Sequence, residues 1–383
     1  MKVVYLSIND ARDVKHWSGL VHYMYKCVAD QGVQVSLVNC RVPYGIWLKL
    51  KGKLIKLFTG GESYMLNRDP GYAKRVAANA EAQLKKLQYD VIFSPGSLPF
   101  VYLQTDKPMV FWTDATFDAM VGFYPGWDKL SALCLKYGNS AEQTAIDKSS
   151  LVLYASDWAR ASAIDRYGAN PDKIKQVPFG ANMEAVPTLE EVRRAIHRRQ
   201  QVKSVNLLFV GIDWERKGGD LAVETVVKLR EKGVDAVLTL VGSQLPDRFS
   251  MPFVKHYPLL KKSVKEDAEK LQELYQQATF FILPTRAECF GVVFAEAGAY
   301  GLPVITSNVG GCPSAVKDSY SGFCLSLTDF ASAAVKKIQL LLNAPELYEQ
   351  FSLHAYERFN NELNWGVIGK RVVGALQSVV KED

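Results

Sequence analysis

The stretch that decides the fold is residues 280–306, which read FFILPTRAECFGVVFAEAGAYGLPVIT. It begins with an apolar run at 280–283 that has the length and composition of a buried strand, and it ends with a second such run at 303–306. Glu288 is therefore expected in the loop after a strand, and Glu296 in the helix that leads to the next strand. Strands that alternate with helices in this way predict a parallel sheet covered by helices.

The segment between the two glutamates combines two kinds of binding group. The backbone N–H groups of Phe290, Gly291 and Val292 are expected in the first turn of the helix, where they have no partner within the helix. Such N–H groups, together with the helix dipole, attract a phosphate. Ionised carboxylates such as those of Glu288 and Glu296 accept hydrogen bonds from hydroxyl groups. A site that offers both features suits a nucleotide sugar.

The alternation of strands and helices extends over the whole chain. Apolar runs predict strands at 3–8, 33–38, 90–94, 108–112, 151–154, 205–210, 236–241, 280–283 and 304–306. The polar, arginine-rich stretch at 190–204 is interpreted as the connection between two domains. The fold class is therefore expected to be α/β, with two doubly wound, Rossmann-like domains at 1–190 and 200–365 and a ligand in the cleft that they face.

Four helix starts are predicted from capping residues, and one of them is Ser156, which is expected to cap a helix that stops at Gly168. Ser18 is expected to cap a helix that ends at Gly32. The segments 140–143 and 263–266 each have a serine followed three residues later by glutamine or glutamate, which is the pattern of a capping box. Each segment is therefore expected at the N-terminus of its helix.

The composition excludes several classes of protein. The 383 residues are 48% hydrophobic and 22% charged, as is usual for a soluble globular protein, and no apolar run approaches the roughly 20 residues needed to span a bilayer. The run at 3–8 is interpreted as a strand rather than a signal peptide because charged residues follow it at once. The cysteines and histidines are scattered, so we expect a cytoplasmic protein without disulfides, metal or other cofactor.

The net charge of +6 is a mild excess that is compatible with an anionic ligand or surface. Nucleic-acid binding favours a concentrated basic stripe with interleaved aromatic residues, so no nucleic-acid partner is expected. One basic and apolar segment, residues 47–58, reads WLKLKGKLIKLF. It fits peripheral contact with a membrane, and it also fits a mobile, solvated surface segment.

A second group of functional residues lies at 211–219, in the sequence GIDWERKGG after the first predicted strand of the second domain. Arg216 and Lys217 place two cations between a strand and a helix, on the side where ligands of such folds bind. Both side chains bind phosphate oxygens, and they would stabilise a departing diphosphate without a metal. The alternative is a solvated pair of charges, although cations near a helix N-terminus are mildly unfavourable on their own.

With these motifs, the chain resembles the retaining glycosyltransferases of the GT-B fold, in the group 1 or family 4 class. The resemblance is strong over 205–325 and weaker over 1–185. It implies transfer of a hexose-type sugar from a UDP- or GDP-sugar to a hydroxyl acceptor, with retention of the anomeric configuration and without a metal. The stretches that carry it are PTRAECFGVVFAEA at 284–297, Arg216-Lys217-Gly218, GLPVIT at 301–306, and Gly310-Gly311 with Gly322.

The resemblance also implies a role for each residue of the motifs. Glu288 would contact the hydroxyl groups of the donor sugar and stabilise the cationic transition state. Glu296 would bind the hydroxyl groups of the ribose. Arg216 and Lys217 would hold the diphosphate and act in catalysis with Glu288. The N–H groups of residues 290–292 would support the sugar and the phosphates.

Two positions depart from the family pattern. The family commonly has an arginine directly after the strand glycine, where this chain has Ile212, and we expect Arg216 to supply that cation. Many relatives have a histidine that contacts the sugar at the end of a strand in the first domain, where this chain has Asp114. Asp114 is expected to bind donor hydroxyls or to act on the acceptor, and it also fits a helix or turn cap.

The first domain is expected to bind the acceptor, which would be a carbohydrate, a lipid-linked sugar or a small molecule. Ser18 and Gly19 lie at a position similar to the N-terminal glycine loop of the family, and Gly19 would let a substrate approach the backbone closely. The alternative is an ordinary helix cap. In relatives a C-terminal helix crosses back to the first domain, and residues 366–383 are expected to do so here.

Other functions stay open on the sequence. A nucleotide-sugar epimerase or a phosphorylase would use the same fold, and a binding-only relative would hold the nucleotide without turnover. A Rossmann oxidoreductase is disfavoured because no predicted strand is followed by Gly-x-Gly-x-x-Gly.

Overall fold

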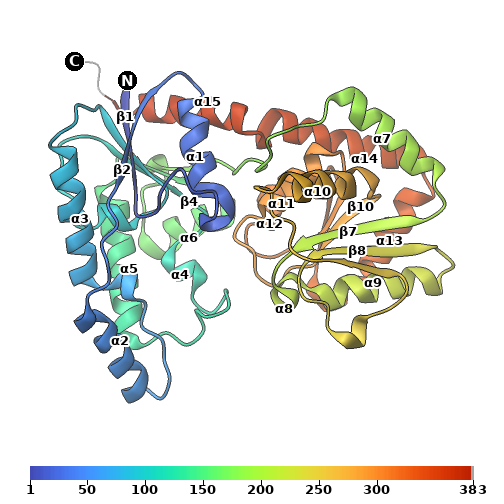
Figure 1. Cartoon of the computed structure of the whole chain (residues 1–383), viewed down its shortest axis with the longest axis horizontal. Helices are drawn as coiled ribbons and strands as arrows, with labels where there is room; N and C mark the ends of the chain where they lie inside the picture. Colours follow the sequence, from blue (N-terminus) through green and yellow to red (C-terminus); the bar gives the residue numbers. More distant parts are fainter. Residues whose placement is uncertain (381–383) are drawn as a thin grey trace. The chain divides into compact units, whose positions relative to one another are not determined.

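The computed structural model describes residues 1–380, which form two compact units (Figure 1). Unit 1 comprises Met1–Phe179 together with the C-terminal segment from Trp365, and unit 2 comprises Gly180–Asn364. Each unit is built on a six-stranded sheet whose strands pair in parallel. The prediction of two doubly wound α/β domains is therefore confirmed.

The sheet of unit 1 has the strand order β2-β1-β3-β4-β5-β6. Helices connect these strands because parallel neighbours need crossover connections, and the carboxyl ends of the strands consequently lie along one edge of the sheet. The strands are β1 (Lys2–Ser7), β2 (Gln34–Asn39), β3 (Val91–Ser94), β4 (Met109–Thr113), β5 (Leu151–Tyr154) and β6 (Ile174–Gln176). The helices are α1 (Leu20–Ala29), α2 (Ile46–Phe58), α3 (Pro70–Leu84), α4 (Phe117–Met120), α5 (Ala132–Lys148), α6 (Asp157–Tyr167) and α15 (Trp365–Gln377).

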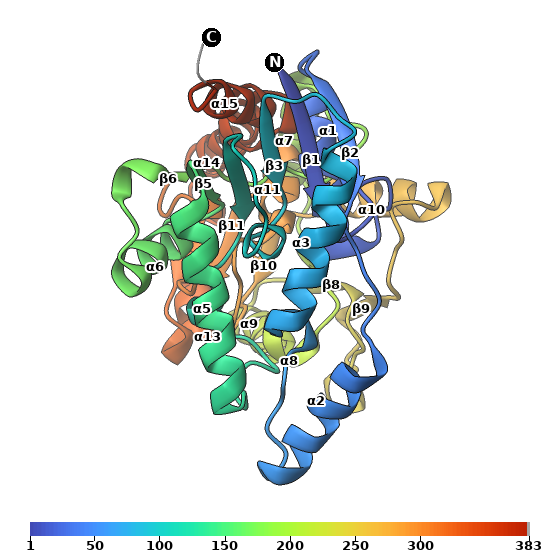
Figure 2. The same ribbon diagram turned by 90° about the vertical axis from the view of Figure 1, so that its left-hand side faces the viewer.

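Both faces of this sheet are buried. Strand β1 reports on both of them, because successive residues of a strand point to opposite sides. On β1, Val4 and Leu6 belong to an apolar cluster that they share with residues of α3, α5 and α6. Tyr5 points to the other face, where its hydroxyl group donates to the carbonyl oxygen of Val21 on α1, at 2.7 Å. Figure 2 shows α3 and α5 in front of the strands.

The C-terminal helix α15 packs along α1 in the same unit. Gly369 permits this close approach, since a Cβ atom there would overlap the carbonyl oxygen of Cys27 on α1. The ring of Trp365 stacks on that of Tyr23, with the centroids 5.9 Å apart. Residues 381–383, which the sequence analysis assigned to this helix, lie outside the described residues.

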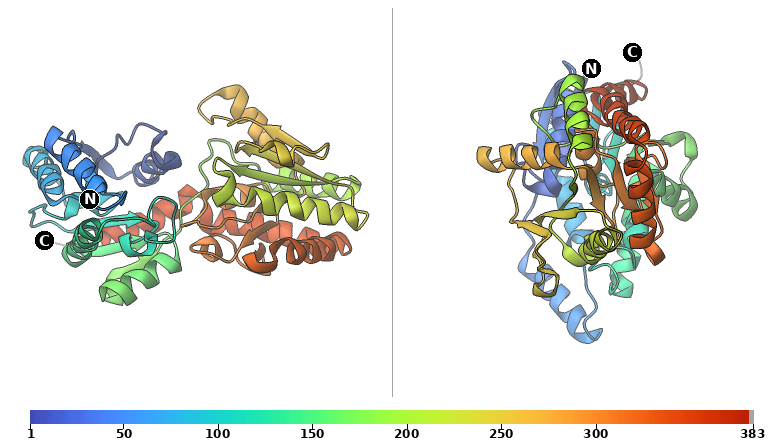
Figure 3. Two further views of the ribbon diagram at one scale, coloured as in Figure 1. Left: turned by 90° about the horizontal axis from the view of Figure 1, so that it is seen from below. Right: turned by 90° about the vertical axis from the view of Figure 1, so that its right-hand side faces the viewer.

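The sheet of unit 2 has the order β12-β11-β10-β7-β8-β9. Helices α9 and α13 lie side by side on one of its faces, and α10 and α11 cover the other (Figures 1 and 3). The strands are β7 (Val205–Gly211), β8 (Ala236–Gly242), β9 (Val254–Tyr257), β10 (Phe280–Leu283), β11 (Val304–Ser307) and β12 (Gly322–Leu325). The helices are α7 (Leu189–Gln201), α8 (Trp214–Lys217), α9 (Gly219–Glu231), α10 (Lys265–Gln277), α11 (Val292–Ala299), α12 (Cys312–Ala315), α13 (Phe330–Leu342) and α14 (Pro345–Arg358).

The chain passes from unit 1 to unit 2 at residues 179–180, and not within 190–204 as the composition indicated. Most of the latter stretch belongs to α7, which Thr188 opens with a capping box. The buried Arg199 donates hydrogen bonds to backbone carbonyl oxygens, including that of Gly301 at 3.1 Å. A composition rich in arginine therefore conceals a helix whose inner face is buried in unit 2.

Neither predicted capping box is formed, although 263–266 does lie at the predicted start of a helix, α10, which ends at Gln277. Residues 140–143 lie inside α5, whose N-terminus is capped by the hydroxyl group of Ser131. At 263–266, α10 begins with Val264 as its N-cap residue, and no side chain caps it. A serine and an acid or amide at the right spacing also occur within helices and loops, so the pattern alone does not locate a helix start.

Three strands of the structure were not predicted, namely β6, β9 and β12. Each is the outermost strand of its sheet. An outermost strand has a neighbour on one side only, and on β9 the residues Lys255 and His256 are exposed to solvent. On β6 and β9, polar residues therefore interrupt the apolar run that marks a central strand of a parallel sheet. The third strand, β12, is a short apolar run, GFCL, that the prediction missed.

The basic segment at 47–58 belongs to the helix α2, none of whose residues is buried. Its contact with a membrane stays a prediction. Among residues 1–380, no helix combines the length and the apolar composition that crossing a bilayer requires.

Candidate active site

The predicted donor-binding residues of unit 2 gather at the carboxyl ends of β7 and β10. Arg216 and Lys217 lie in α8 directly after β7, and Glu288 lies in the loop after β10. The two strands are neighbours in the sheet although more than 70 residues separate Lys217 from Glu288 in sequence. The strand order therefore brings the two motifs together.

Helix α8 is short, and both of its ends are fixed. The carboxylate of Asp213 accepts a hydrogen bond from the N–H of Arg216 at 3.1 Å and so caps the helix. Gly218 ends it with φ of 72°, in the left-handed region. A Cβ atom at this position would overlap the carbonyl oxygen of Pro284, so only glycine lets the helix approach the loop after β10.

The centre of the candidate site is an ion cluster. The ammonium group of Lys217 pairs with the carboxylate of Glu288. Nη1 of Arg216 lies 3.9 Å from the same carboxylate and donates to the carbonyl oxygen of Ala287 at 3.1 Å. Lys217 is 9% exposed and Glu288 is 8% exposed. One carboxylate and two cations are therefore held together in a largely desolvated place.

A further ion pair joins the same two loops, and sequence reasoning did not identify it. The guanidinium group of Arg286 donates two hydrogen bonds to the carboxylate of Asp220, at 2.9 and 2.7 Å. Burial would raise the pKa of Asp220, but the hydrogen bonds from Arg286 outweigh it and hold that pKa below its ordinary value. The N–H of Arg286 also donates to the carbonyl oxygen of Arg216 at 2.6 Å. These contacts fix the position of α8 relative to the loop that carries Glu288.

The predicted phosphate-binding N–H groups lie at the N-terminus of α11. Val292 is the first residue of this helix, and Gly291 precedes it with φ of 87°. A Cβ atom on Gly291 would overlap the ring of Phe294 and would lie 3.3 Å from Cγ of Glu288. The glycine therefore lets Glu288 lie against the start of the helix, with the buried Phe290 between them in sequence. Phosphate contact by residues 290–292 stays a prediction.

Glu296 is 2% exposed and lies in α11. Its carboxylate pairs with the ammonium group of Lys262 and accepts a hydrogen bond from the hydroxyl group of Tyr275 at 3.2 Å. Burial, and then the charge of Glu296, raise the pKa of Tyr275 well above its ordinary value, so the phenol keeps its proton and acts as donor. The sequence has no motif that marks Lys262 or Tyr275, because their pairing depends on how α10 and its preceding loop pack on α11.

In unit 1 the predicted acceptor-side residues have unusual backbone geometry. Trp17 and Ser18 have φ of 50° and 54°, and Gly19 has φ of 87°. The N-cap residue of α1 is Gly19, and no side chain caps the helix, so the expectation that Ser18 caps it is wrong. Left-handed conformations cost a non-glycine residue about 1–3 kcal/mol and tend to gather at functional sites.

Asp114 directly follows β4 and is half-buried. The helix after it, α4, is capped by the hydroxyl group of Thr116, which accepts from the N–H of Ala119 at 3.1 Å. The capping role that the sequence left open for Asp114 is therefore filled by another residue at this helix. The predicted part of Asp114 in binding stays a prediction.

A buried polar cluster beside Asp114 was missed by sequence reasoning, which took Glu142 for part of a capping box. The hydroxyl group of Ser97 donates to Glu142 at 2.8 Å, and Nη1 of Arg68 lies 3.7 Å from the same carboxylate oxygen. Burial raises the pKa of Glu142, against the opposing effects of Arg68 and Ser97. Within residues 1–380, Oε1 of Glu142 and the hydroxyl group of Tyr154 have no hydrogen-bond partner.

This cluster borders a hollow of about 150 Å³ whose lining includes the ends of β1, β3 and β4. Thr113 and Ala115, on either side of Asp114 in sequence, are part of the lining. The carboxyl ends of parallel strands are where such folds bind ligands. The hollow therefore adds a buried acid and a guanidinium group to the candidate residues of unit 1.

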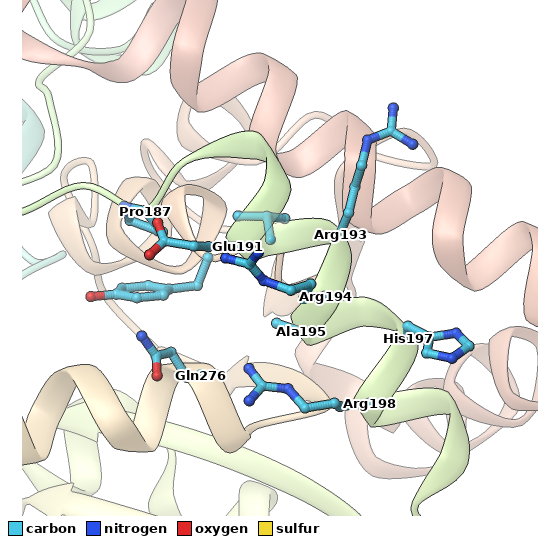
Figure 4. Close-up of a pocket in the computed structure, with 10 residues that line it drawn as sticks. Pro187, Glu191, Arg193, Arg194, Ala195, His197, Arg198 and Gln276 are labelled. Carbon is cyan, nitrogen blue, oxygen red and sulfur yellow. The ribbon is translucent and has the colours of Figure 1, made fainter.

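A larger hollow, of about 630 Å³, lies elsewhere in unit 2 and contains none of the predicted site residues (Figure 4). It is bordered by α7, by Gln276 near the end of α10 and by Tyr300, and the side chains of Arg194 and Arg198 lie beside it. Gln276 and Tyr300 precede β10 and β11 in sequence, so this hollow lies at the amino ends of these strands. The ion cluster lies at their carboxyl ends.

Comparison with known families decides what kind of protein carries this cluster. Residues 193–358 match the family model described as glycosyl transferases group 1, and residues 20–185 match the model described as glycosyltransferase family 4. The chain belongs to the group 1 glycosyltransferases. The predicted membership of the group 1 class is confirmed, and the first match covers the whole ion cluster and α11.

Curated relatives of this group 1 glycosyltransferase act on different substrates. The D-inositol 3-phosphate glycosyltransferase of Corynebacterium diphtheriae is 26% identical over 60% of this chain and 56% of its own length. The glycogen synthase of Mycobacterium tuberculosis is 24% identical over 69% of this chain and 61% of its own. The chain thus spans about half the length of the first curated relatives it matches.

Solved structures with the same fold extend over almost the whole chain. The sucrose-phosphate synthase of Thermosynechococcus elongatus superposes with a TM-score of 0.71 at 18% identity, and 99% of each chain is covered. HepE of Anabaena, solved in complex with UDP-glucose, superposes with a TM-score of 0.65 at 14% identity over 99% of this chain and 100% of its own. At these identities the similarity shows the GT-B fold.

Within residues 1–380, no three His, Cys, Asp or Glu side chains are grouped so that they could hold a metal ion. The absence of a metal requirement stays a prediction about the reaction, and it is tested below.

Proposed function

We propose that the protein transfers a hexose-type sugar from a UDP- or GDP-sugar to a hydroxyl acceptor, with retention of the anomeric configuration and without a metal. The observation that carries the proposal is the cluster of Glu288 with Lys217 and Arg216. A carboxylate that accepts hydrogen bonds from sugar hydroxyls lies there beside two cations that bind phosphate.

The chemistry gives each group of the cluster a task. When the bond between the sugar and the diphosphate breaks, negative charge grows on the leaving oxygen and positive charge grows on the sugar. Lys217 and Arg216 would stabilise the former, and Glu288 would stabilise the latter. Their low exposure strengthens both effects, because charges interact more strongly where water is excluded. Two protein cations then supply the neutralisation that a metal would otherwise give.

Glu296 would bind the ribose of the donor. Its carboxylate is held by Tyr275 from the protein interior and by Lys262 from a partly exposed loop. Ribose hydroxyl groups would take the place of the Lys262 ammonium group while Tyr275 stays in position. The bound UDP-glucose of Anabaena HepE makes a UDP-sugar the first donor to test.

The acceptor would be recognised by unit 1. Glu142 and Arg68 offer an acceptor and a donor of hydrogen bonds beside a hollow that is wide enough for part of a hydroxylated molecule. Asp114 follows the strand that contributes to the same hollow. Ser18 and Gly19 would bring the backbone near α1 into contact with substrate, as the family resemblance implies.

The proposal is tested by incubating the protein with UDP-, GDP- and ADP-sugars, in the presence of EDTA, and measuring the released nucleotide diphosphate. We expect release from one UDP- or GDP-sugar, and Glu288→Gln should slow it at least about 100-fold, the scale for losing one preorganised electrostatic group. Glu273→Gln is the matched control, because it makes the same change at an exposed glutamate of the same unit, which pairs with Lys270 on α10. A Glu288→Gln variant with a near-normal rate would contradict the site.

The products separate the alternatives. Retention predicts that an α-linked donor sugar appears as an α-linked product in the proton NMR spectrum of the transfer reaction. A new nucleotide sugar without release of diphosphate would indicate an epimerase instead. Formation of sugar 1-phosphate that requires inorganic phosphate would indicate a phosphorylase. Donor binding without any turnover, also with acceptors present, would indicate a binding-only relative.

A further inference from the structure

Helix α2 lies at one end of unit 1, beyond the strands (Figures 1 and 2). It is attached to the unit by one face only. Leu48 and Ile55 pack against an apolar cluster that contains Tyr64. Lys51, between them, reaches Oδ2 of Asp69 at 2.7 Å. Residues 48, 51 and 55 follow one another at helical spacing, so these contacts fix which face of α2 turns inward.

A second face of α2, next to the attached one, is apolar and exposed. None of the residues of this helix is buried, and Trp47 and Phe58 are 80% and 81% exposed. At 100° per residue, the exposed apolar side chains fall within one arc of about 120° that adjoins the attached face on one side. Contiguous exposed apolar surface of this kind marks an interaction site. The residues of this apolar face are Ile46, Trp47, Leu50, Leu54, Leu57 and Phe58.

Lysines border the apolar face along one side. Lys49, Lys53 and Lys56 are exposed and lie next to it on the helix. The sequence from 31 to 61 contains five lysine or arginine residues and no aspartate or glutamate. The partner of this face must therefore accept apolar side chains and positive charge at the same time.

We propose that α2 docks unit 1 on a bilayer surface that contains anionic phospholipid. The helix would lie in the plane of the interface, with its apolar face inserted below the headgroups and its lysines at the phosphates. Trp47 suits this position because tryptophan is enriched at membrane interfaces. The attachment through Lys51 and Leu48 fixes the orientation of the unit on the surface.

Two other partners fit the helix less well. A second copy of the chain, paired by a twofold axis, would bring the same face of each α2 together. In an antiparallel pairing, the lysines of both helices would lie on the same side without any acidic residue of this segment to balance them, which is unfavourable. A nucleic acid would neutralise the lysines, but it would leave the leucine and isoleucine side chains without an apolar partner.

The proposal is tested by co-sedimentation of the full chain with vesicles. Vesicles of phosphatidylcholine with 30% phosphatidylglycerol are compared with vesicles of phosphatidylcholine alone. We expect binding to the anionic vesicles that is at least about 100-fold stronger and that weakens as salt is added. A lysine near an anionic surface strengthens binding about fivefold, so replacing Lys49, Lys53 and Lys56 by glutamine should weaken it roughly 100-fold.

A matched control removes the same charge elsewhere in unit 1. Lys85, Lys86 and Lys107 are exposed, and their replacement by glutamine also lowers the net charge by three. This variant should bind the vesicles less than threefold more weakly than the original protein. A variant with Trp47→Gln and Phe58→Gln keeps every charge and should lose at least tenfold in binding, because it lacks the inserted rings.

Several outcomes would overturn the proposal. Equal weakening by the two lysine triples would mean that net charge alone attracts the protein. Absence of binding to anionic vesicles, with the thermal melting temperature of the protein unchanged, would exclude the bilayer. A dimer in size-exclusion chromatography that Trp47→Gln and Phe58→Gln dissociate would assign the face to a second copy. Donor cleavage in solution is expected to be unchanged in all these variants, so failure of this proposal is separate from failure of the proposed function.

Discussion

The pair of Lys217 and Glu288 gives the sharpest test of the candidate site, because its effects on stability and on activity can be separated. Three variants form a cycle: Lys217→Met, Glu288→Gln, and the two together. Each single change leaves the other charge largely buried without its main partner. The double change removes both charges and keeps similar volumes. Stability should therefore fall in the single variants and recover in the double variant, whereas activity should not recover.

The magnitude follows from the burial of the pair. Removing one partner of a fully buried ion pair costs about 3–5 kcal/mol. Here both side chains are slightly exposed, and Arg216 stays 3.9 Å from Glu288, so we expect about 2–3 kcal/mol for Lys217→Met, below that range. For a unit of this size, that loss lowers the melting temperature by roughly 5–10 °C. The double variant should lose less than about 1 kcal/mol, since it leaves no unpaired charge.

The assay combines urea unfolding with two activity measurements. Each variant, the double included, should release nucleotide diphosphate at least about 100-fold more slowly than the original protein. Lys217→Met should weaken the binding of UDP at least about tenfold, the scale of one charge-assisted contact, and should leave the binding of uridine unchanged. Calorimetric titration with both ligands measures the difference.

Three results would refute the reasoning. A Lys217→Met variant as stable as the original would mean that the ion pair contributes nothing to the folded state. Recovery of activity in the double variant would mean that the two charges serve only each other. Equal losses of affinity for UDP and uridine would place Lys217 away from the diphosphate.

Three further predictions concern single positions. Gly218→Ala should lower the free energy of unfolding in urea by about 2–4 kcal/mol, because a φ of 72° is strained for alanine and the new Cβ atom would overlap the carbonyl oxygen of Pro284. An unchanged midpoint of urea unfolding would contradict the close approach of α8 to the loop after β10. Burial raises the pKa of Glu142 above its ordinary value, so the ionised carboxylate destabilises the folded state at high pH. The Glu142→Gln variant should therefore have a higher melting temperature than the original protein at pH 8 and an equal one at pH 4. A lower melting temperature at pH 8 would show that the ion pair of Glu142 with Arg68 outweighs the effect of burial. Tyr275→Phe removes one hydrogen bond from the buried Glu296 and should lower the free energy of unfolding by about 1–3 kcal/mol. It should also weaken the binding of uridine in calorimetric titration. Unchanged affinity for uridine would mean that Glu296 does not bind the ribose.

The central strands and the meeting of the two motifs could be predicted from the sequence. The runs at 205–210 and 280–283 are apolar throughout, as expected for strands buried on both faces. Because parallel strands present their carboxyl ends at one edge, residues just after such runs are brought to the same edge. Arg216, Lys217 and Glu288 therefore gather in unit 2 although they are distant in sequence.

The partners of the buried acids could not be predicted in the same way. Lys262 reaches Glu296 from a loop without a motif, and Arg68 reaches Glu142 from a turn far away in sequence. Which side chain meets a buried acid depends on how helices pack on the sheet, and that packing leaves no periodic signal. The pattern around Glu142 even suggested a helix cap, since a short polar motif has the same letters in the middle of a helix as at its start.

If the protein has the proposed function, Glu288 and Glu296 contribute to the donor site in different ways. Each is held by one lysine, Glu288 by the buried Lys217 and Glu296 by the partly exposed Lys262. A lysine ammonium group has three donors, so Lys217 can donate to Glu288 and to a phosphate oxygen at the same time. Moving it away would leave the buried carboxylate of Glu288 without its partner. Lys262 would return to water at a lower cost, because its side chain is already partly solvated, although it would also give up its hydrogen bond to the carbonyl oxygen of Asn182, at 3.0 Å. The diphosphate of the donor would therefore meet the fixed pair of Lys217 and Glu288, whereas the ribose would displace Lys262 from Glu296. Replacing Lys262 should then change the affinity for a nucleoside without slowing the chemical step.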